Sequence, residues 1–200
     1  MIEVRSGGRR RIDRVLDPGY VAGLGELRLG EVRARRDDAA QEETDLSYLR
    51  RLLHARIDIV RAEQRRRHEG GSTPVVTELG RILAVNAVGP ATGSGRHQTL
   101  QPSRAEAHRR HVEALVADVD LSDVGSLSGE QLDGALQAYC HEEASVSQRR
   151  REVQHVVDTF NAEIGSRYAS GAASVDELLA EQRQLTEPDK ARTAGTEQPA

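Results

Sequence analysis

The chain has 200 residues, of which only 2% are aromatic, and Leu, Ile, Val and Phe together number 44. This apolar content lies just above the level at which chains stop folding, so it excludes a large globular core. The 28 basic and 32 acidic residues give a net charge of −4, which argues against a general nucleic-acid coat protein.

The first third of the chain predicts one long helix. Residues 1–20 show little apolar periodicity and begin with a Gly/Arg stretch, so we expect a flexible N-terminal arm. From Gly30 to His68 no proline or further glycine interrupts a run of good helix formers, which predicts a helix roughly 57 Å long. Gly70 follows as a helix-ending residue. We assign residues 21–69 to a first repeat.

The next segment has a different composition. Residues 70–120 contain clusters of Gly, Pro, Ser and Thr, which are typical of a linker. Short helices are expected within it over residues 75–88 and 103–118. We therefore describe residues 70–120 as a flexible insert with short helices.

A second long helix follows the insert. Ser128 and Gln131 match a capping box, which predicts a helix from about residue 129 to residue 168. This helix belongs to a second repeat over residues 121–169. Residues 170–200 are expected to hold a short helix and then a polar, disordered tail.

Two helices of similar length bury their apolar stripes best when they pack antiparallel. The predicted fold is therefore all-α, a long antiparallel coiled-coil hairpin with short accessory helices. The predicted seam consists of Leu46, Leu49, Leu53, Ile57 and Val60 in the first helix and of Tyr139, Val146, Val153 and Phe160 in the second, with Val156, Val157 and Ile164 filling in.

The two long helices are copies of one another at a shift of 100 residues. Between residues 21–67 and 121–167, 11 of 47 positions are identical, and most of these are polar or charged. The apolar seam is only similar between the copies. Selection for packing alone would favour the opposite pattern, so the shared polar residues point to a function.

Five polar residues recur with one spacing in both copies. The first set is Glu43, Ser47, Arg50, His54 and Asp58, and the second is Glu143, Ser147, Arg150, Gln154 and Asp158. At about 100° per residue each set falls within an arc of about 80°, on a line roughly 22 Å long. Each line flanks the seam, and in an antiparallel hairpin the two lines can form one composite surface.

This set of side chains suits a guanine nucleotide. An arginine can donate two hydrogen bonds to O6 and N7 of guanine, or bind a phosphate. Carboxylates can accept the N1–H and N2–H donors of guanine, and Ser, Gln or His can complete contacts to phosphate or ribose. A ligand with both donors and anionic groups is thus the best match.

The doubled spacing Glu-x3-Ser-x2-Arg-x3-Gln-x3-Asp resembles the signature of the RsiG family of actinobacterial anti-sigma factors. The second copy matches all five positions, and the first departs only at His54. Two further segments are similar to that family, namely LSYLRRLLHARIDIV (residues 46–60) and RRIDRVLDP (residues 10–18). The resemblance covers roughly residues 10–180.

The resemblance implies a specific function. It implies that two molecules of cyclic di-GMP bind to the ten residues of the doubled motif. It also implies that the loaded hairpin holds a WhiG-type, flagellar-like sigma factor inactive and so controls sporulation genes. The alternative is a coiled-coil adaptor that binds a protein partner directly, without nucleotide.

Other functions have weaker support. No Gly-rich phosphate loop or catalytic triad is present, so we do not expect an enzyme. Glu152 with His155, and His108 with His111, have metal-ligand spacing but lack partner motifs, so we expect no metal. Residues 1–69 hold 16 basic and 13 acidic residues, and this net charge of +3 is too weak for DNA binding.

The sequence also bears on location. No apolar run reaches the roughly 18–20 residues of a membrane span, and no apolar segment follows the basic N-terminus. The single Cys140 cannot form an internal disulfide. We therefore expect a cytoplasmic protein that does not contact a membrane.

Overall fold

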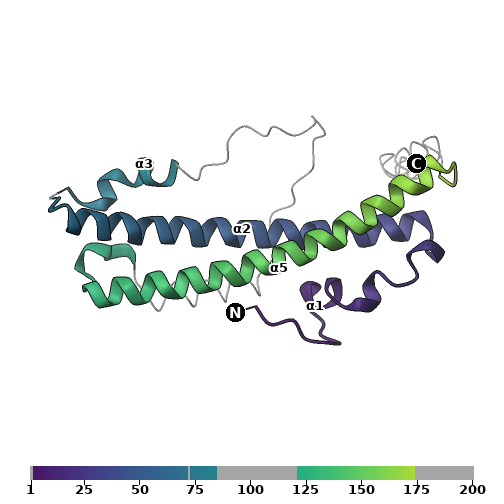
Figure 1. The fold of residues 1–200 in the computed structure, drawn as a ribbon, viewed down its shortest axis with the longest axis horizontal. Helices are drawn as coiled ribbons and strands as arrows, with labels where there is room; N and C mark the ends of the chain where they lie inside the picture. Colours follow the sequence, from purple (N-terminus) through teal and green to yellow (C-terminus); the bar gives the residue numbers. More distant parts are fainter. Residues whose placement is uncertain (1, 72, 85–120, 174–200) are drawn as a thin grey trace, which may run out of the picture.

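Two long helices dominate the structure, a computed structural model that describes residues 2–71, 73–84 and 121–173. Helix α2 spans Leu29–His68 and helix α5 spans Gly129–Ala169. They lie side by side and run antiparallel (Figure 1). The predicted all-α hairpin is confirmed, and both helices begin and end within one residue of the predicted positions.

Local sequence signals set the ends of both helices. At the start of α5, Ser128 Oγ accepts a hydrogen bond from the Gln131 amide, and Gln131 Oε1 accepts one from the Ser128 amide, which is the predicted capping box. At the end of α2, Gly70 adopts a φ of +67°, a left-handed conformation that favours glycine. The helices therefore stop where their capping residues require.

The predicted seam forms the core of the hairpin. The nine principal seam residues are all buried, and Val156, Val157 and Ile164 are partly buried. The steps of three and four keep these side chains on one face of each helix, and burial of that face holds the hairpin together. The same core also contains acidic side chains, namely Glu42, Asp45, Glu63 and Glu142.

The N-terminal segment was expected to be a flexible arm, but in the structure it folds onto the hairpin. Helix α1 (Arg11–Val15) contacts both long helices, and Ile12 and Val15 are 0% and 1% exposed. The Ile2 amide donates a hydrogen bond to Ser145 Oγ on α5 (3.2 Å). A five-residue helix is too short to show apolar periodicity, so tertiary burial of a few residues decides this docking.

Short elements complete the described parts. Short 3-10 helices precede the long helices, namely η1 (Pro18–Tyr20) and η2 (Leu24–Glu26) before α2 and η4 (Leu121–Ser126) before α5. In the insert, η3 (Val75–Glu78) and helix α3 (Leu79–Ala84) pack on α2.

The described residues include only part of the predicted insert and tail. The described portion of the helix expected over 75–88 is formed by η3 and α3, and Val75 and Ile82 bury themselves against the core. The helix expected over 103–118 and the helix and tail expected beyond residue 173 lie outside the described residues. None of the helices in the described ranges is long and apolar enough to cross a membrane.

Candidate functional site

The two lines of motif residues face the same side of the hairpin. Side chains of one line form hydrogen bonds with side chains of the other, which requires both lines to share this side. Arg50 Nε on α2 donates hydrogen bonds to Glu143 Oε1 (3.0 Å) and Ser147 Oγ (2.9 Å) on α5. In the opposite direction, Arg150 Nη1 on α5 donates to Glu43 Oε1 (2.9 Å) on α2. The arginine of each copy thus reaches the glutamate of the other copy.

Each glutamate also binds the serine of its own helix. Ser47 Oγ donates to Glu43 Oε1 (2.8 Å), and Ser147 Oγ donates to Glu143 Oε1 (2.6 Å). The same arrangement therefore occurs twice, related by approximate twofold symmetry. We call the set Arg50, His54, Glu143 and Ser147 half-site A, and the set Arg150, Gln154, Glu43 and Ser47 half-site B.

The half-sites differ at the position where the first copy departs from the motif. In half-site A, Nε2 of His54 lies 3.2 Å from Glu143 Oε1 without hydrogen-bond geometry, and this nitrogen is shielded from solvent. In half-site B, Gln154 is exposed and its Oε1 accepts a hydrogen bond from Arg150 Nη1 (3.1 Å). Position 54 therefore faces the opposite helix, whereas position 154 binds a residue of its own helix.

The charged side chains of the half-sites remain accessible. The glutamates are 20–27% exposed and the arginines 27–42% exposed. Burial alone would raise the pKa of Glu143, but hydrogen bonds from Ser147 and Arg50 and the nearby His54 outweigh it and lower this pKa. Glu143 is therefore ionised at neutral pH and can act as a hydrogen-bond acceptor.

The two aspartates of the motif mark the ends of the composite surface. Asp58 and Asp158 each follow the glutamate of their own helix by 15 residues, about 22 Å along the axis. Because the helices are antiparallel, the aspartates lie toward opposite ends of the surface. Asp58 is half-buried and Asp158 is exposed. Eight residues thus form the centre, and an aspartate extends it at each end.

The repeat also contains a structural contact that was not predicted from the sequence. Arg67, near the end of α2, pairs with Glu63 (Nε to Oε1, 2.6 Å) and donates from Nη2 to the backbone oxygens of Gly125 (3.1 Å) and Val124 (3.5 Å). This contact ties the end of α2 to the segment that precedes α5. We call it the first end clasp.

The second end clasp repeats the first at a shift of 100 residues. Arg167 pairs with Glu163 (2.7 Å) and donates to the backbone oxygens of Leu24 (2.7 Å) and Gly25 (3.4 Å), ahead of α2. Glu, Arg and Gly are identical between the copies at these positions, and that identity was the available signal. The clasps fix the hairpin at both ends, with the half-sites between them.

The described residues contain no group of three or more His, Cys, Asp or Glu side chains placed to hold a metal ion. Glu152, which had metal-ligand spacing to His155, instead pairs with Arg149 (2.8 Å). The pair His108 and His111 lies outside the described residues.

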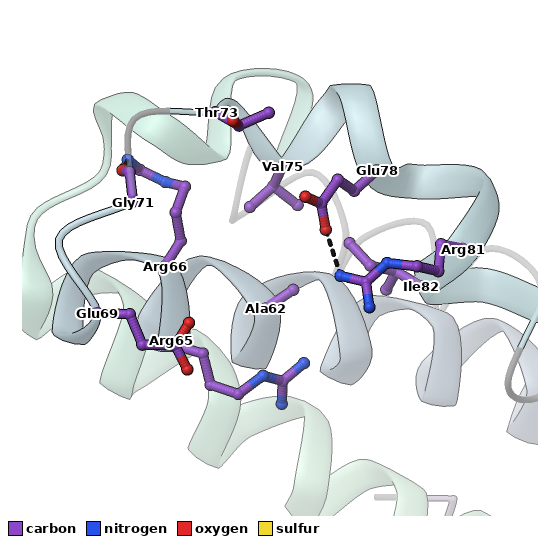
Figure 2. A pocket seen from close by; sticks show the side chains of 10 residues that line it. All are labelled: Ala62, Arg65, Arg66, Glu69, Gly71, Thr73, Val75, Glu78, Arg81 and Ile82. Atoms are coloured by element: carbon purple, nitrogen blue, oxygen red, sulfur yellow. Dashed lines mark hydrogen bonds and ion pairs between the residues drawn. The ribbon is translucent and has the colours of Figure 1, made fainter.

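A cavity of about 220 Å³ lies apart from the motif, where α2 ends against η3 and α3 (Figure 2). Buried apolar side chains of Ala62, Val75 and Ile82 contribute to it, and Glu78 pairs with Arg81 at its edge. It is smaller than the roughly 300–1,000 Å³ of typical small-molecule sites. A second cavity, of about 380 Å³, lies where the N-terminal segment meets Arg35 of α2. None of the ten motif residues lines either cavity, so the candidate site is the face of the hairpin that carries the motif.

Residues 18–83 and 118–182, together about two thirds of the chain, match the RsiG-like family. Each matched segment contains one long helix with one copy of the motif. No curated protein matches the chain. The RsiG-like family consists of anti-sigma regulators and is not an enzyme family. The extent of this match, together with the doubled motif on two antiparallel helices, shows that the chain belongs to the RsiG-like family.

Proposed function

We propose that this chain is an anti-sigma factor that binds two molecules of cyclic di-GMP on the composite surface. When loaded, it sequesters a WhiG-type sigma factor and so controls sporulation gene transcription. Membership of the RsiG-like family supports this proposal. The observation that carries it is the reciprocal pairing of Arg50 with Glu143 and of Arg150 with Glu43, since it joins both motif copies on one face.

Each half-site contains the groups that a guanine nucleotide needs. A guanidinium can donate to guanine O6 and N7, and an ionised carboxylate can accept hydrogen bonds from N1–H and N2–H. The serine and the His or Gln side chain can add hydrogen bonds to phosphate or ribose. Two half-sites related by approximate symmetry match two ligand molecules.

Within the hairpin the arginines and glutamates of the half-sites bind one another. Ion pairs with this degree of exposure contribute about 0.2–1 kcal/mol each. A ligand with micromolar affinity has a binding free energy of about −8 kcal/mol. The free energy lost when these ion pairs are replaced by ligand contacts is small by comparison. The internal pairs hold the side chains at the site without closing it.

Cyclic di-GMP favours sigma binding only if it binds the complex more tightly than the free hairpin. A ligand bound on the face of the hairpin satisfies this condition when the sigma factor covers the bound ligand and makes additional contacts with it. By reciprocity, the sigma factor then raises the affinity for cyclic di-GMP by the same factor.

Calorimetry tests the proposal directly. Cyclic di-GMP titrated into the parent protein should bind with a stoichiometry of two. Replacing both Arg50 and Arg150 with alanine should weaken binding by about 2–4 kcal/mol, whereas helicity by circular dichroism should stay the same. Sigma binding measured with and without the nucleotide should differ, and equal affinities would remove the ligand-dependent part of the proposal.

One observation favours the coiled-coil adaptor as a second candidate. Arg50 and Arg150 already have protein partners, so the polar lines can act as links between the helices alone. Under this hypothesis the parent protein binds no cyclic di-GMP, and a protein partner binds equally well with and without it.

A further inference from the structure

The composite surface carries too little positive charge for its proposed ligand. The ten motif residues include four carboxylates and two guanidinium groups, which give a net charge of −2 with His54 neutral. Each cyclic di-GMP molecule has two phosphodiester groups, so two molecules bring four negative charges. Without further cations, ligand and surface would repel one another.

The two motif arginines do not supply the missing charge in full. Arg50 Nε lies 3.0 Å from Glu143 Oε1, and Arg150 Nη1 lies 2.9 Å from Glu43 Oε1. Each guanidinium is thus partly neutralised by a carboxylate across the hairpin. A phosphate contact by either group would have to compete with that ion pair.

Arg51 and Arg151 directly follow the motif arginines and are identical in the two copies. Both are exposed, and neither makes a hydrogen bond or ion pair within the described parts of the chain. On an ideal helix each lies about 20° beyond the aspartate of its own motif copy, on the edge of the polar line that faces away from the seam. Two uncommitted guanidinium groups therefore border the composite surface.

We propose that Arg51 and Arg151 are phosphate-binding residues that form the outer edge of the cyclic di-GMP site. This inference rests on the proposed function. A guanidinium without a partner binds a phosphodiester through two parallel hydrogen bonds and breaks no existing ion pair. The pair also raises the net charge of the surface from −2 to zero. Their identity in both copies follows if each serves one of the two ligand molecules.

The test is a titration of the full-length chain with cyclic di-GMP in about 50 mM and about 300 mM NaCl. The variant R51A/R151A is compared with the control R5A/R9A, which also removes two positive charges. Arg5 and Arg9 are exposed on the N-terminal segment, which contacts α5 at Ser145. Ser145 lies about 200° round the helix from Glu143, so this segment is on the side of α5 away from the motif. The variant R50A/R150A reports separately on the motif.

R51A/R151A should weaken ligand binding about 3- to 10-fold relative to R5A/R9A at low salt. The difference should shrink at high salt, because salt screens exposed charges. Equal affinity of R51A/R151A and R5A/R9A, with binding lost in R50A/R150A, overturns this inference and leaves the proposed function standing. Loss of sigma binding with unchanged ligand affinity also overturns it and assigns the arginines to the protein partner. A parent protein that binds no nucleotide refutes both.

Discussion

At the residue scale, position 54 is where the two half-sites differ. The second copy carries Gln154, a neutral side chain that both donates and accepts hydrogen bonds. The first copy carries His54, whose Nε2 lies 3.2 Å from the Glu143 carboxylate on the other helix. A neutral imidazole has one nitrogen that donates and one that accepts a hydrogen bond, in a fixed ring geometry. The two half-sites therefore offer a ligand different hydrogen-bonding groups at this position.

We predict that the variant His54→Gln, which restores the motif, strengthens ligand binding at half-site A. A glutamine can both donate and accept a hydrogen bond at this position, as Gln154 can in half-site B. The affinity for cyclic di-GMP measured by calorimetry should therefore rise about 3- to 10-fold over that of the parent protein. An unchanged affinity would contradict this role.

At the element scale, the end of α2 depends on one buried carboxylate. Glu63 is 1% exposed and accepts hydrogen bonds from Arg66 (2.7 Å) and Arg67 (2.6 Å). The hydrogen bond from Arg66 is the main cause that lowers its pKa, to about 2, against the opposing effect of burial. Because Arg67 also holds the segment before α5, this carboxylate supports the first end clasp.

We predict that Glu63 makes the stability of the hairpin sensitive to acid. Its pKa is lower in the folded state than the ordinary value of about 4.5, so its contribution to stability is complete above about pH 4.5 and is lost as the pH falls toward about 2. Glu63→Gln should lower the free energy of unfolding at pH 7 by about 1–3 kcal/mol and flatten this acid dependence. Urea unfolding followed by circular dichroism at several pH values measures both effects.

The matched control is Glu163→Gln in the second end clasp. Glu163 pairs with Arg167 but is 25% exposed, so its replacement should cost less stability than that of Glu63. Equal losses in the two variants would show that burial of Glu63 is not the reason for its effect.

At the scale of the whole molecule, the hairpin has approximate twofold symmetry. The half-sites at its centre and the clasps at its ends all repeat at a shift of 100 residues. The N-terminal segment departs from this symmetry, because α1 docks on the hairpin beside α2 and α5 (Figure 1). The composite surface is thus nearly symmetric on a molecule that is not.

We predict that cyclic di-GMP stabilises the whole hairpin, since a ligand that contacts both helices binds only the folded state. At 100 times the dissociation constant each bound molecule should add about 2.7 kcal/mol to the free energy of unfolding. The melting temperature should therefore rise with the nucleotide and stay unchanged with cyclic di-AMP, whose adenines lack O6. An equal rise in R50A/R150A would show that the ligand binds elsewhere.

Features that depend on local periodicity and capping could be predicted from the order of the residues. The steps of three and four place Leu46, Leu53 and Val153 on buried faces, because the geometry of a helix is fixed by its own backbone. The capping box at Ser128 and the glycine at position 70 set helix ends for the same reason. The common face of the two motif lines also followed from their shared spacing.

The contacts across the hairpin, by contrast, depend on how the two helices pack in three dimensions. The pairing of each motif arginine with the glutamate of the other copy depends on the register between segments about 100 residues apart. The end clasps use backbone oxygens as acceptors, so the repeated Glu, Arg and Gly marked the positions without revealing what each arginine binds. The docking of Ile12 and Val15 depends on a hydrophobic surface that exists only after α2 and α5 have packed together.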